Sequence, residues 1–371
     1  MRLDAFTERV MRKNKSNQSR LPLTISAQYG LVDQITFFNK VVASTDLSNY
    51  YLLKKGEFAY NKSYSSDYPW GAIKRLDNYD QGALSSLYIC FAPQDNVVSD
   101  FILQYFESPK WHKGISEIAV EGARNHGLLN VAVQDFFHTY HYVPKDKKEQ
   151  IKISKLLMLL DERIATQSKI IEDLKKLKSA IIEKLYSEIQ GKEYSFGQLF
   201  DVVNERNKQM EYSNILSASQ EKGMVNRDDL NLDIQFERSN INTYKIVRKG
   251  DYVIHLRSFQ GGFAFSNKLG VCSPAYTILR PNNLLEYGYL SNYFTSQRFI
   301  KSLILVTYGI RDGRSINVDE WLGMKTTIPS KEHQQYIVKA IGSFDRKIES
   351  EEAYATHLSK QKQYLLRQMF I

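Results

Sequence analysis

Few of the reactive side chains in this sequence have the spacing that catalysis requires. Adjacent carboxylates occur at Asp228 and Asp229 and again at Asp161 and Glu162, and an acid–base pair needs two different environments. Both pairs lie in strongly charged stretches, which favours plain solvated carboxylates. Ser258 has neither the pattern of a nucleophile elbow nor a base partner. We therefore expect no catalytic residue in this chain.

Metal and cofactor motifs are also missing from the sequence. His138 and His141 have a spacing that a helix would bring to one face, but they lie in an aromatic run, residues 136–143, that reads as a strand. No third and fourth ligands accompany them. The sequence contains no Walker A loop, no dinucleotide-binding glycine turn and no Asn/Asp-Pro-Pro-aromatic motif of amino-methylating enzymes. We expect this chain to bind no metal and no cofactor.

Length and composition indicate a folded, basic protein of two domains. The chain has 371 residues, of which 43% are hydrophobic, and a formal net charge of +9, which suits a polyanionic partner such as nucleic acid. The charge alone leaves the partner open, because many basic proteins bind nothing acidic. The sequence has no apolar run long enough to span a membrane, no signal-peptide pattern, and only two cysteines, Cys90 and Cys272. We expect a cytoplasmic protein that contacts no membrane.

The sequence contains an internal repeat, which changes the interpretation of the whole chain. Each copy has a basic-Gly-acidic turn ahead of an alternating apolar strand, at 55–57 and at 249–251. Further matches follow in the same order, and each copy reaches a proline, Pro144 or Pro329, shortly before a long helical pattern. Each match is weak by itself, but their common order along the chain indicates a duplication.

The two helical patterns share one heptad register at an offset of 184 residues. Seven heptad core positions are apolar in both copies, and two are polar in both, at Gln167 and Glu351 and at Lys178 and Lys362. Each pattern covers roughly 30 residues, or about 45 Å of helix, and a helix of this length cannot bury its apolar stripe alone. We predict an antiparallel coiled-coil pair, in which the polar positions either set the register or extend their charged ends to solvent. The predicted seam residues are Leu157, Leu160, Ile164, Ile171, Leu174, Ile181, Leu185, Ile341, Phe344, Ile348, Leu358, Leu365 and Met369.

Two like units joined through antiparallel helices would have an internal pseudo-twofold. A two-fold protein of this kind can hold two half-sites a fixed distance apart on a DNA duplex. Because the two copies differ in sequence, the target should be bipartite and asymmetric.

In these features the chain resembles the specificity subunits of type I restriction-modification systems. The resemblance covers essentially the whole chain and rests on the segments 250–251, 273–276, 308–311, 316–318, 328–335 and 344–348. In the first copy it rests on Pro144, 149–151 and 160–164. It implies an α+β fold: a target-recognition domain at 1–148, a central long helix at 149–190, a second target-recognition domain at 191–330, and a C-terminal long helix at 331–371 that pairs with the central one.

The resemblance also implies the partners of the chain. These are double-stranded DNA, two modification subunits that bind S-adenosylmethionine and methylate adenine, and restriction subunits that cleave DNA with ATP and Mg. The cofactors would therefore lie on the partner subunits. The first repeat begins almost at the start of the sequence, so the short segment that usually precedes the first domain is brief or missing.

We expect basic loops to contact phosphates and polar or aromatic loop residues to contact bases. Each of these loops could instead be an ordinary solvated turn. The candidate DNA-binding residues are Arg12, Lys13, Lys15, Lys62, Tyr64, Trp70, Arg124, Asn125, Arg206, Lys208, Arg257, Ser258, Gln260, Arg311 and Arg314. Three other interpretations stay open: a protein-interaction scaffold that binds no DNA, a fragment of a fused restriction-modification enzyme, and a silent recognition cassette.

Overall fold

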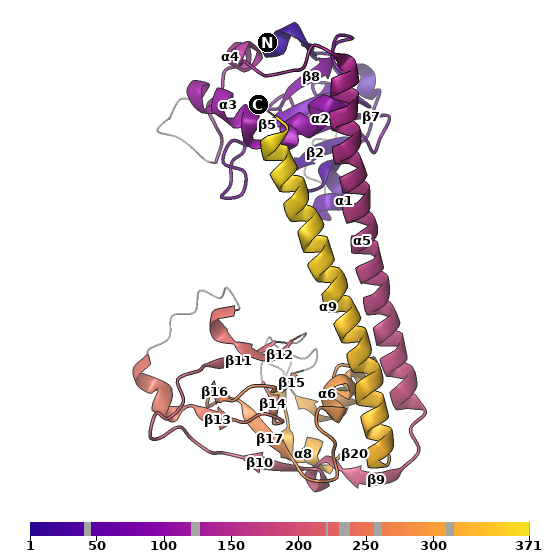
Figure 1. Ribbon diagram of the computed structural model, residues 1–371, viewed down its shortest axis with the longest axis vertical. Coiled ribbons are helices and arrows are strands. Elements are labelled where there is room, and N and C mark those ends of the chain that lie inside the picture. Colours follow the sequence, from indigo (N-terminus) through magenta and orange to yellow (C-terminus); the bar gives the residue numbers. More distant parts are fainter. Residues whose placement is uncertain are drawn as a thin grey trace. The chain divides into compact units, whose positions relative to one another are not determined.

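The protein was analysed as a computed structural model, which describes residues 1–40, 46–119, 127–219, 222–229, 238–255, 262–308 and 315–370. The chain forms two compact units (Figure 1). Unit 1 consists of Met1–Ser168 together with Ala353–Ile371, and unit 2 consists of Lys169–Glu352. Both unit boundaries fall inside the two long helices, so each helix contributes residues to both units. Among the described residues, no helix has the length and apolar character needed to cross a bilayer.

Unit 1 contains two four-stranded sheets. One has the order β1-β8-β5-β6, and the other has the order β3-β2-β7-β4, in which only β2 and β7 are parallel. The strands are β1 (Thr7–Arg9), β2 (Pro22–Ser26), β3 (Gly30–Asp33), β4 (Tyr51–Lys54), β5 (Phe58–Asn61), β6 (Ala72–Arg75), β7 (Gln81–Leu84) and β8 (Ile89–Pro93). Leu53, Ala59, Leu84 and Cys90 are buried together with other residues of both sheets, so the two sheets share one core.

A second, aromatic core of unit 1 lies between the first sheet and its helices. The helices are α1 (Gln34–Phe38), α2 (Ser99–Glu107), α3 (His112–Ile118) and α4 (Val133–His138), of which α2, α3 and α4 contribute to this core. Phe58 and Phe91 stack from neighbouring strands, and Tyr60 stacks on Phe136 of α4. Burying rings of this size supplies much of the stability of a unit this small.

Unit 2 has strands that pair in a matching order. Its four-stranded sheet is β10-β17-β14-β15, and two antiparallel pairs, the hairpin β11-β12 and the non-consecutive pair β13-β16, complete the unit's main strands. The bounds are β9 (Lys192–Ser195), β10 (Phe200–Val203), β11 (Leu216–Ser219), β12 (Gly223–Asn226), β13 (Lys245–Val247), β14 (Tyr252–Ile254), β15 (Phe263–Phe265), β16 (Gly270–Cys272), β17 (Thr277–Pro281), β18 (Thr307–Tyr308), β19 (Ser315–Ile316) and β20 (Lys325–Ile328). Its short helices are α6 (Tyr289–Tyr293), α7 (Gln297–Ser302) and α8 (Val318–Gly323).

The basic-Gly-acidic turn has the same geometry in both units. Gly56 and Gly250 have φ values of +86° and +99°, which favour glycine. Across each turn the acidic side chain accepts a hydrogen bond from a backbone N–H three residues earlier, Glu57 from Lys54 at 2.7 Å and Asp251 from Arg248 at 2.8 Å. The turn therefore starts β5 and β14 in the same way.

The two long helices are α5 (Lys147–Ser187, 41 residues) and α9 (Lys331–Gln368, 38 residues). Both helices begin about ten residues before the first heptad position. The segments that precede the two patterns are rich in Lys, Glu and Gln, which are good helix formers. A buried glutamine holds the first turn of each. Gln150 accepts from Val98 N–H and donates to Pro144 O, and Gln334 accepts from Glu286 N–H and donates to Pro329 O.

Each unit's core receives residues from both long helices. In unit 1, Leu157 of α5 lies in the aromatic core with Leu366 and Phe370 from the end of the chain. In unit 2, Ile337 and Ile341 of α9 lie in the core with Ile182 and Tyr186 of α5. Of the predicted seam residues, Leu157, Leu160, Ile341, Ile348 and Leu358 are buried, and Ile164, Ile171, Leu174, Ile181, Leu185, Phe344, Leu365 and Met369 are half-buried.

The polar heptad positions are engaged between the helices or along them. Lys178 of α5 forms an ion pair with Asp345 of α9 within unit 2, and Lys362 of α9 forms one with Asp161 of α5 within unit 1. Gln167 is buried, and Glu351 pairs with Lys347 one turn away.

Candidate nucleic-acid interface

The directions of the strands in unit 1 gather several loops at one end of its sheets. The end of β4, the start of β5, the end of β6 and the start of β7 meet at one end, where Lys55 N–H donates to Asp80 O and Gly56 N–H donates to Leu76 O. The opposite end therefore holds the start of β4 and the loop that follows β5. Because β2 runs parallel to β7, the turn after β2 lies at this opposite end too. We call it the loop end of unit 1.

Three of the candidate residues lie in the loop between β5 and β6, at the loop end. Tyr64 is exposed, Lys62 is half-buried, and Trp70 packs partly against the aromatic core. Tyr60 supports the loop, since its hydroxyl donates to Trp70 O at 2.9 Å. Gly71 closes the loop at a φ of +77°, where a Cβ would lie 2.1 Å from Asn61 O.

Backbone hydrogen bonds connect the β5–β6 loop to residues 127–129, which follow the candidate residues Arg124 and Asn125 in the sequence. Leu129 N–H donates to Lys62 O at 2.9 Å, and Tyr64 N–H donates to Gly127 O at 3.1 Å. Arg124 and Asn125 lie outside the described residues. These hydrogen bonds place Gly127 and Leu129, which follow Arg124 and Asn125 in the sequence, beside Lys62 and Tyr64.

The early basic stretch divides into structural and exposed residues. Arg12 forms a bidentate pair with Glu57 at 2.8 Å, and Lys13 donates to Asn49 O while its ammonium lies 4.4 Å from the centre of the Tyr51 ring. Both cations thus stabilise unit 1 itself. Lys15 is exposed, beside the start of β4 and therefore at the loop end.

A buried asparagine, which the sequence reasoning missed, holds this stretch in both units. The Asn14 side chain donates to Ser19 O and accepts from Ser19 N–H, both at 2.8 Å. The Asn207 side chain donates to Tyr212 O at 2.7 Å and accepts from Tyr212 N–H at 3.1 Å. The signal for it was an asparagine at the matching place of both copies, next to the lysine. Each asparagine closes a five-residue loop that leaves Lys15 or Lys208 exposed.

The candidate residues of unit 2 lie mostly beyond the described part of the chain. Arg206 and Lys208 are described and exposed, whereas Arg257, Ser258, Gln260, Arg311 and Arg314 lie outside it. The described flanks fix where their loops start. His255 N–H donates to Gly262 O at 2.8 Å at the base of the first, and β18 pairs with β19 at the base of the second.

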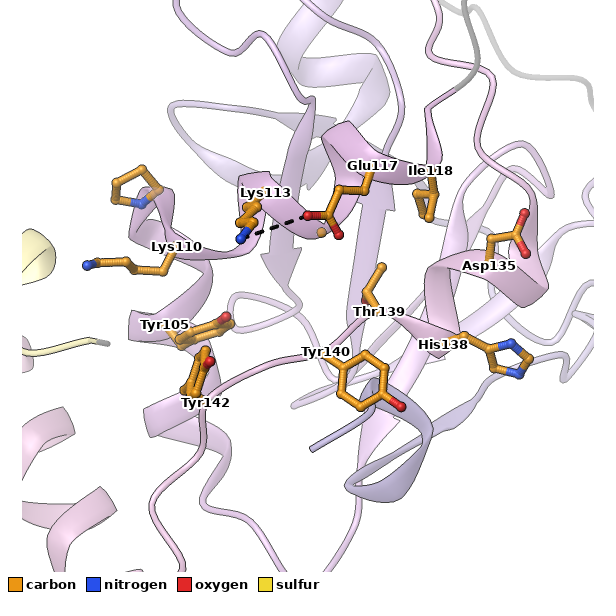
Figure 2. Close-up of a pocket in the computed structure, with 12 residues that line it drawn as sticks. Tyr105, Lys110, Lys113, Glu117, Ile118, Asp135, His138, Thr139, Tyr140 and Tyr142 are labelled. Atoms are coloured by element: carbon orange, nitrogen blue, oxygen red, sulfur yellow. Dashed lines mark ion pairs between the residues drawn. The ribbon is translucent and has the colours of Figure 1, made fainter.

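An open pocket of about 540 Å³ lies on unit 1 beside α3 and α4 (Figure 2). Tyr105, Lys110, Tyr140 and Tyr142 contribute to its wall, and Lys113 pairs with Glu117 across 4.0 Å. Its charges are mixed in sign, which favours no single class of ligand.

The two histidines near this pocket have separate roles. His141 is buried, with Tyr105 Oη 3.0 Å from Nδ1 and Thr139 Oγ1 2.7 Å from Nε2. Burial, together with the positive N-terminal charge, lowers the pKa of His141 to about 4. His138 is exposed and ends α4, and residues 139–143 contain only an isolated bridge at Tyr140, so the strand predicted for 136–143 is wrong. The described residues contain no cluster of three or more histidine, cysteine or acidic side chains able to hold a metal.

The arrangement defines a class of fold: mixed helix-and-sheet units whose cores are completed by two long helices. No family model matches the sequence, and no curated protein matches it closely enough to be reported. Solved structures do match. A chain from a study of complex assembly and conformational transition of the type I R-M system aligns with a TM-score of 0.61 at 13% identity, covering 99% of this chain and 95% of that chain.

The type I restriction-modification system S subunit from M. genitalium aligns with a TM-score of 0.53 at 15% identity, covering 100% of this chain and 95% of that chain. The resemblance to specificity subunits that the sequence suggested is thus confirmed at the level of the fold. The chain has the mixed fold of these subunits, including their long helices.

Proposed function

We propose that this chain is the DNA-specificity subunit of a type I restriction-modification complex. It binds a bipartite, asymmetric DNA target, one half-site to each unit, and recruits modification subunits. One observation carries the proposal: the two units have matching strands, and each long helix begins in the core of one unit and ends in the core of the other. We call this the exchange of helix ends. It suits an internal pseudo-twofold. A pseudo-twofold protein with unlike loops is suited to a split, non-palindromic site.

The matched strands supply a common scaffold, whereas the loops that it carries differ. The loop after β5 contains Lys62, Tyr64 and Trp70, and the loop after β14 contains Arg257, Ser258 and Gln260. Unlike base-contacting groups on like scaffolds would read two different half-sites. The exposed Lys15 and Lys208, at matching places, suit the contact that both half-sites share, the phosphate backbone.

Recruitment of partners is supported by apolar side chains left exposed on α5. Leu156 and Leu159 are exposed in unit 1, and Ile170 and Leu177 are exposed in unit 2. Exposed apolar side chains spaced along one helix favour contact with another protein. In this proposal the chain itself is not catalytic: two modification subunits bind S-adenosylmethionine, and restriction subunits use ATP and Mg. A cytoplasmic complex is part of the same proposal.

The same exposed apolar side chains would also suit a protein-interaction scaffold, so the decisive experiment measures DNA binding directly. The chain would be expressed together with the genes that flank it, and the complex would select duplexes from a randomised library. Methylation of adenines in the same cells would be mapped in parallel. We expect one split motif in both experiments, with two unlike halves and a fixed spacer. Selection of no motif, with partner proteins still bound, would support the scaffold.

One substitution assigns a half-site to a unit. If Arg257 contacts a base edge, Arg257→Ala should cost about 1–3 kcal/mol at the selected target and relax the preference in one half of the motif only. An unchanged motif would remove Arg257 from the interface.

A further inference from the structure

Unit 1 carries a cluster of exposed aromatic side chains, which we call the aromatic tip: Tyr29, Phe37 and Phe38. Their exposed fractions are 64%, 44% and 45%. The Tyr29 and Phe37 ring centres lie 6.3 Å apart, and those of Phe37 and Phe38 lie 5.1 Å apart. Three adjoining aromatic side chains are seldom exposed together on a protein surface, and such a patch indicates an interaction site.

The aromatic tip stands on a built turn. Asp33 caps α1, since its Oδ1 accepts from Ile35 N–H at 3.0 Å and its Oδ2 accepts from Thr36 Oγ1–H at 2.6 Å. Asn39 ends the helix in the left-handed region at a φ of +49°. None of the residues of α1 is buried, so this short helix adds nothing to the core of unit 1. Its capped geometry instead holds Phe37 and Phe38 at the surface.

The tip lies at the loop end of unit 1. Tyr29 belongs to the turn that follows β2, and β2 ends at the same end of the sheets as β5. α1 lies beside β2 (Figure 1). The ring of its Phe37 lies 6.3 Å from the ring of Tyr29. The aromatic tip is therefore on the side of the unit that carries the β5–β6 loop and Lys15.

At the matching place of unit 2, the sequence from Leu216 to Gln235 contains no Phe, Tyr or Trp. There β12 is followed by a short 3-10 turn, Arg227–Asp229, with charged side chains. A partner that binds as two identical copies would need similar surfaces on both units. The two halves of an asymmetric DNA target, in contrast, are different by definition. A surface present in one unit only therefore favours DNA over a duplicated protein partner.

We propose that the aromatic tip contacts the bases of the half-site bound by unit 1, with Phe37 or Phe38 inserted as an apolar wedge at a base step. This inference rests on the DNA-binding function proposed above. Phenylalanine wedges unstack neighbouring base pairs and kink the duplex, and the loss of stacking is offset by contact with the ring. Flexible pyrimidine–purine steps are the easiest to open. The half-site of unit 1 should therefore contain such a step, and the half-site of unit 2 needs none.

The test uses the complex of the chain with its partners and the selected duplex, in which single adenines of each half-site are replaced by 2-aminopurine. Unstacking by the wild-type complex should raise the fluorescence at one step of the unit 1 half-site. In the Phe37→Ala, Phe38→Ala double variant this rise in fluorescence should vanish. The affinity for the selected duplex should fall about tenfold, as expected for the loss of one stacking contact between a base and an aromatic ring. The variant should fold normally, because both rings are exposed.

Two controls accompany the double variant. Phe37→Leu with Phe38→Leu keeps an apolar wedge and should retain most of the fluorescence change. Tyr140→Ala removes a ring that is 75% exposed elsewhere on unit 1 and should change nothing.

The outcomes separate this inference from the function on which it rests. If the wild-type complex binds no DNA, the proposed function fails. If it binds its split target but no step of the unit 1 half-site is unstacked, or if unstacking persists in the double alanine variant, the wedge is overturned while the function stands. If the double variant loses a partner protein and keeps its DNA affinity, the tip is a protein-docking surface and the proposal is wrong.

Discussion

Lys178 Nζ lies 2.5 Å from Asp345 Oδ1 and joins α5 to α9 within unit 2. Unit 1 contains the exchanged pair, Lys362 Nζ with Asp161 Oδ1, also at 2.5 Å. An offset of 184 residues relates the two aspartates and also the two lysines. In each unit the acid comes from the helix that follows the unit's own strands, and the lysine comes from the other helix. A duplication that exchanged the helix ends explains both pairs at once.

The Lys178–Asp345 ion pair should contribute little to the free energy of unfolding, but its contribution should depend on both side chains. Because the Asp345 side chain is 43% exposed, water screens the pair, and we expect Asp345→Ala to lower the free energy of unfolding of unit 2 by about 0.5 kcal/mol. The same substitution made in Lys178→Ala should cost almost nothing more. A double-mutant cycle by urea unfolding measures this coupling, with Lys362 and Asp161 as the matched pair. Additive losses in the double variant would show that the two charges do not interact.

A substitution at the end of one long helix should destabilise the unit that receives this end, and not the unit whose strands precede the helix. The ring of Phe370 lies 5.5 Å from those of Phe101 and Tyr105 in unit 1, and the ring of Tyr186 lies 5.6 Å from that of Tyr289 in unit 2. Phe370→Ala should therefore leave a cavity in unit 1, at a cost of about 3–5 kcal/mol. Tyr186→Ala should destabilise unit 2.

Hydrogen exchange followed by mass spectrometry locates each loss. In Phe370→Ala, peptides from β5 and β8 should exchange faster and peptides from β14 and β17 should not; in Tyr186→Ala the pattern should reverse. Tyr364→Ala is the control on α9, since Tyr364 is 64% exposed. Faster exchange of β14 and β17 in Phe370→Ala would contradict the assignment of Phe370 to unit 1.

The long helices and the repeated turns could be predicted because their signals are local. The heptad pattern fixes which face of a helix is apolar, and Gly56 and Gly250 fix the backbone of a turn, both within a few residues. The partner of a side chain is a different matter. The sequence shows that Arg12 and Lys13 are basic, but their partners Glu57 and Tyr51 follow about 40 residues later, and only the fold brings them together.

The incorrect strand at 136–143 has a similar cause. Aromatic residues suit strands, and that preference concealed a weaker helical period: Val133, Phe136 and Phe137 recur at the spacing of one helix face. In the structure Phe136 and Phe137 of α4 are buried by the aromatic core. Tertiary packing decided between the two patterns, and the sequence alone could not.

His141 should make unit 1 sensitive to mild acid. Burial lowers its pKa from 6.5 to about 4, so the unfolded chain takes up a proton near pH 6.5 while the folded unit stays neutral. The stability is therefore complete above about pH 6.5 and falls as the pH drops toward 4, by up to roughly 1.4 kcal/mol for each pH unit. Below about pH 4 the histidine adds no further change.

Thermal unfolding of the wild type and of His141→Gln between pH 7.5 and pH 4.5 measures this dependence. The variant should be less stable at pH 7.5, because the Tyr105 and Thr139 hydroxyls lose their imidazole partner, but its stability should decline less as the pH falls. Equal declines in both proteins would assign the acid sensitivity to other groups.

Lys15 and Lys208 should contact DNA without reading it. Asn14 and Asn207 hold their loops by paired hydrogen bonds to the residue five positions on, so the two ammonium groups are exposed at matching places of the two units. A phosphate contact releases about one counterion, whatever the base sequence. Lys15→Ala and Lys208→Ala should each weaken binding to all duplexes alike and reduce the slope of log affinity against log salt by about 1. Lys55→Ala is the matched control, because Lys55 is also exposed but lies at the end of unit 1 opposite the loop end. A change of sequence preference in Lys15→Ala would show that this lysine reaches a base, and an equal reduction of the slope in Lys55→Ala would show that DNA does not approach unit 1 from its loop end.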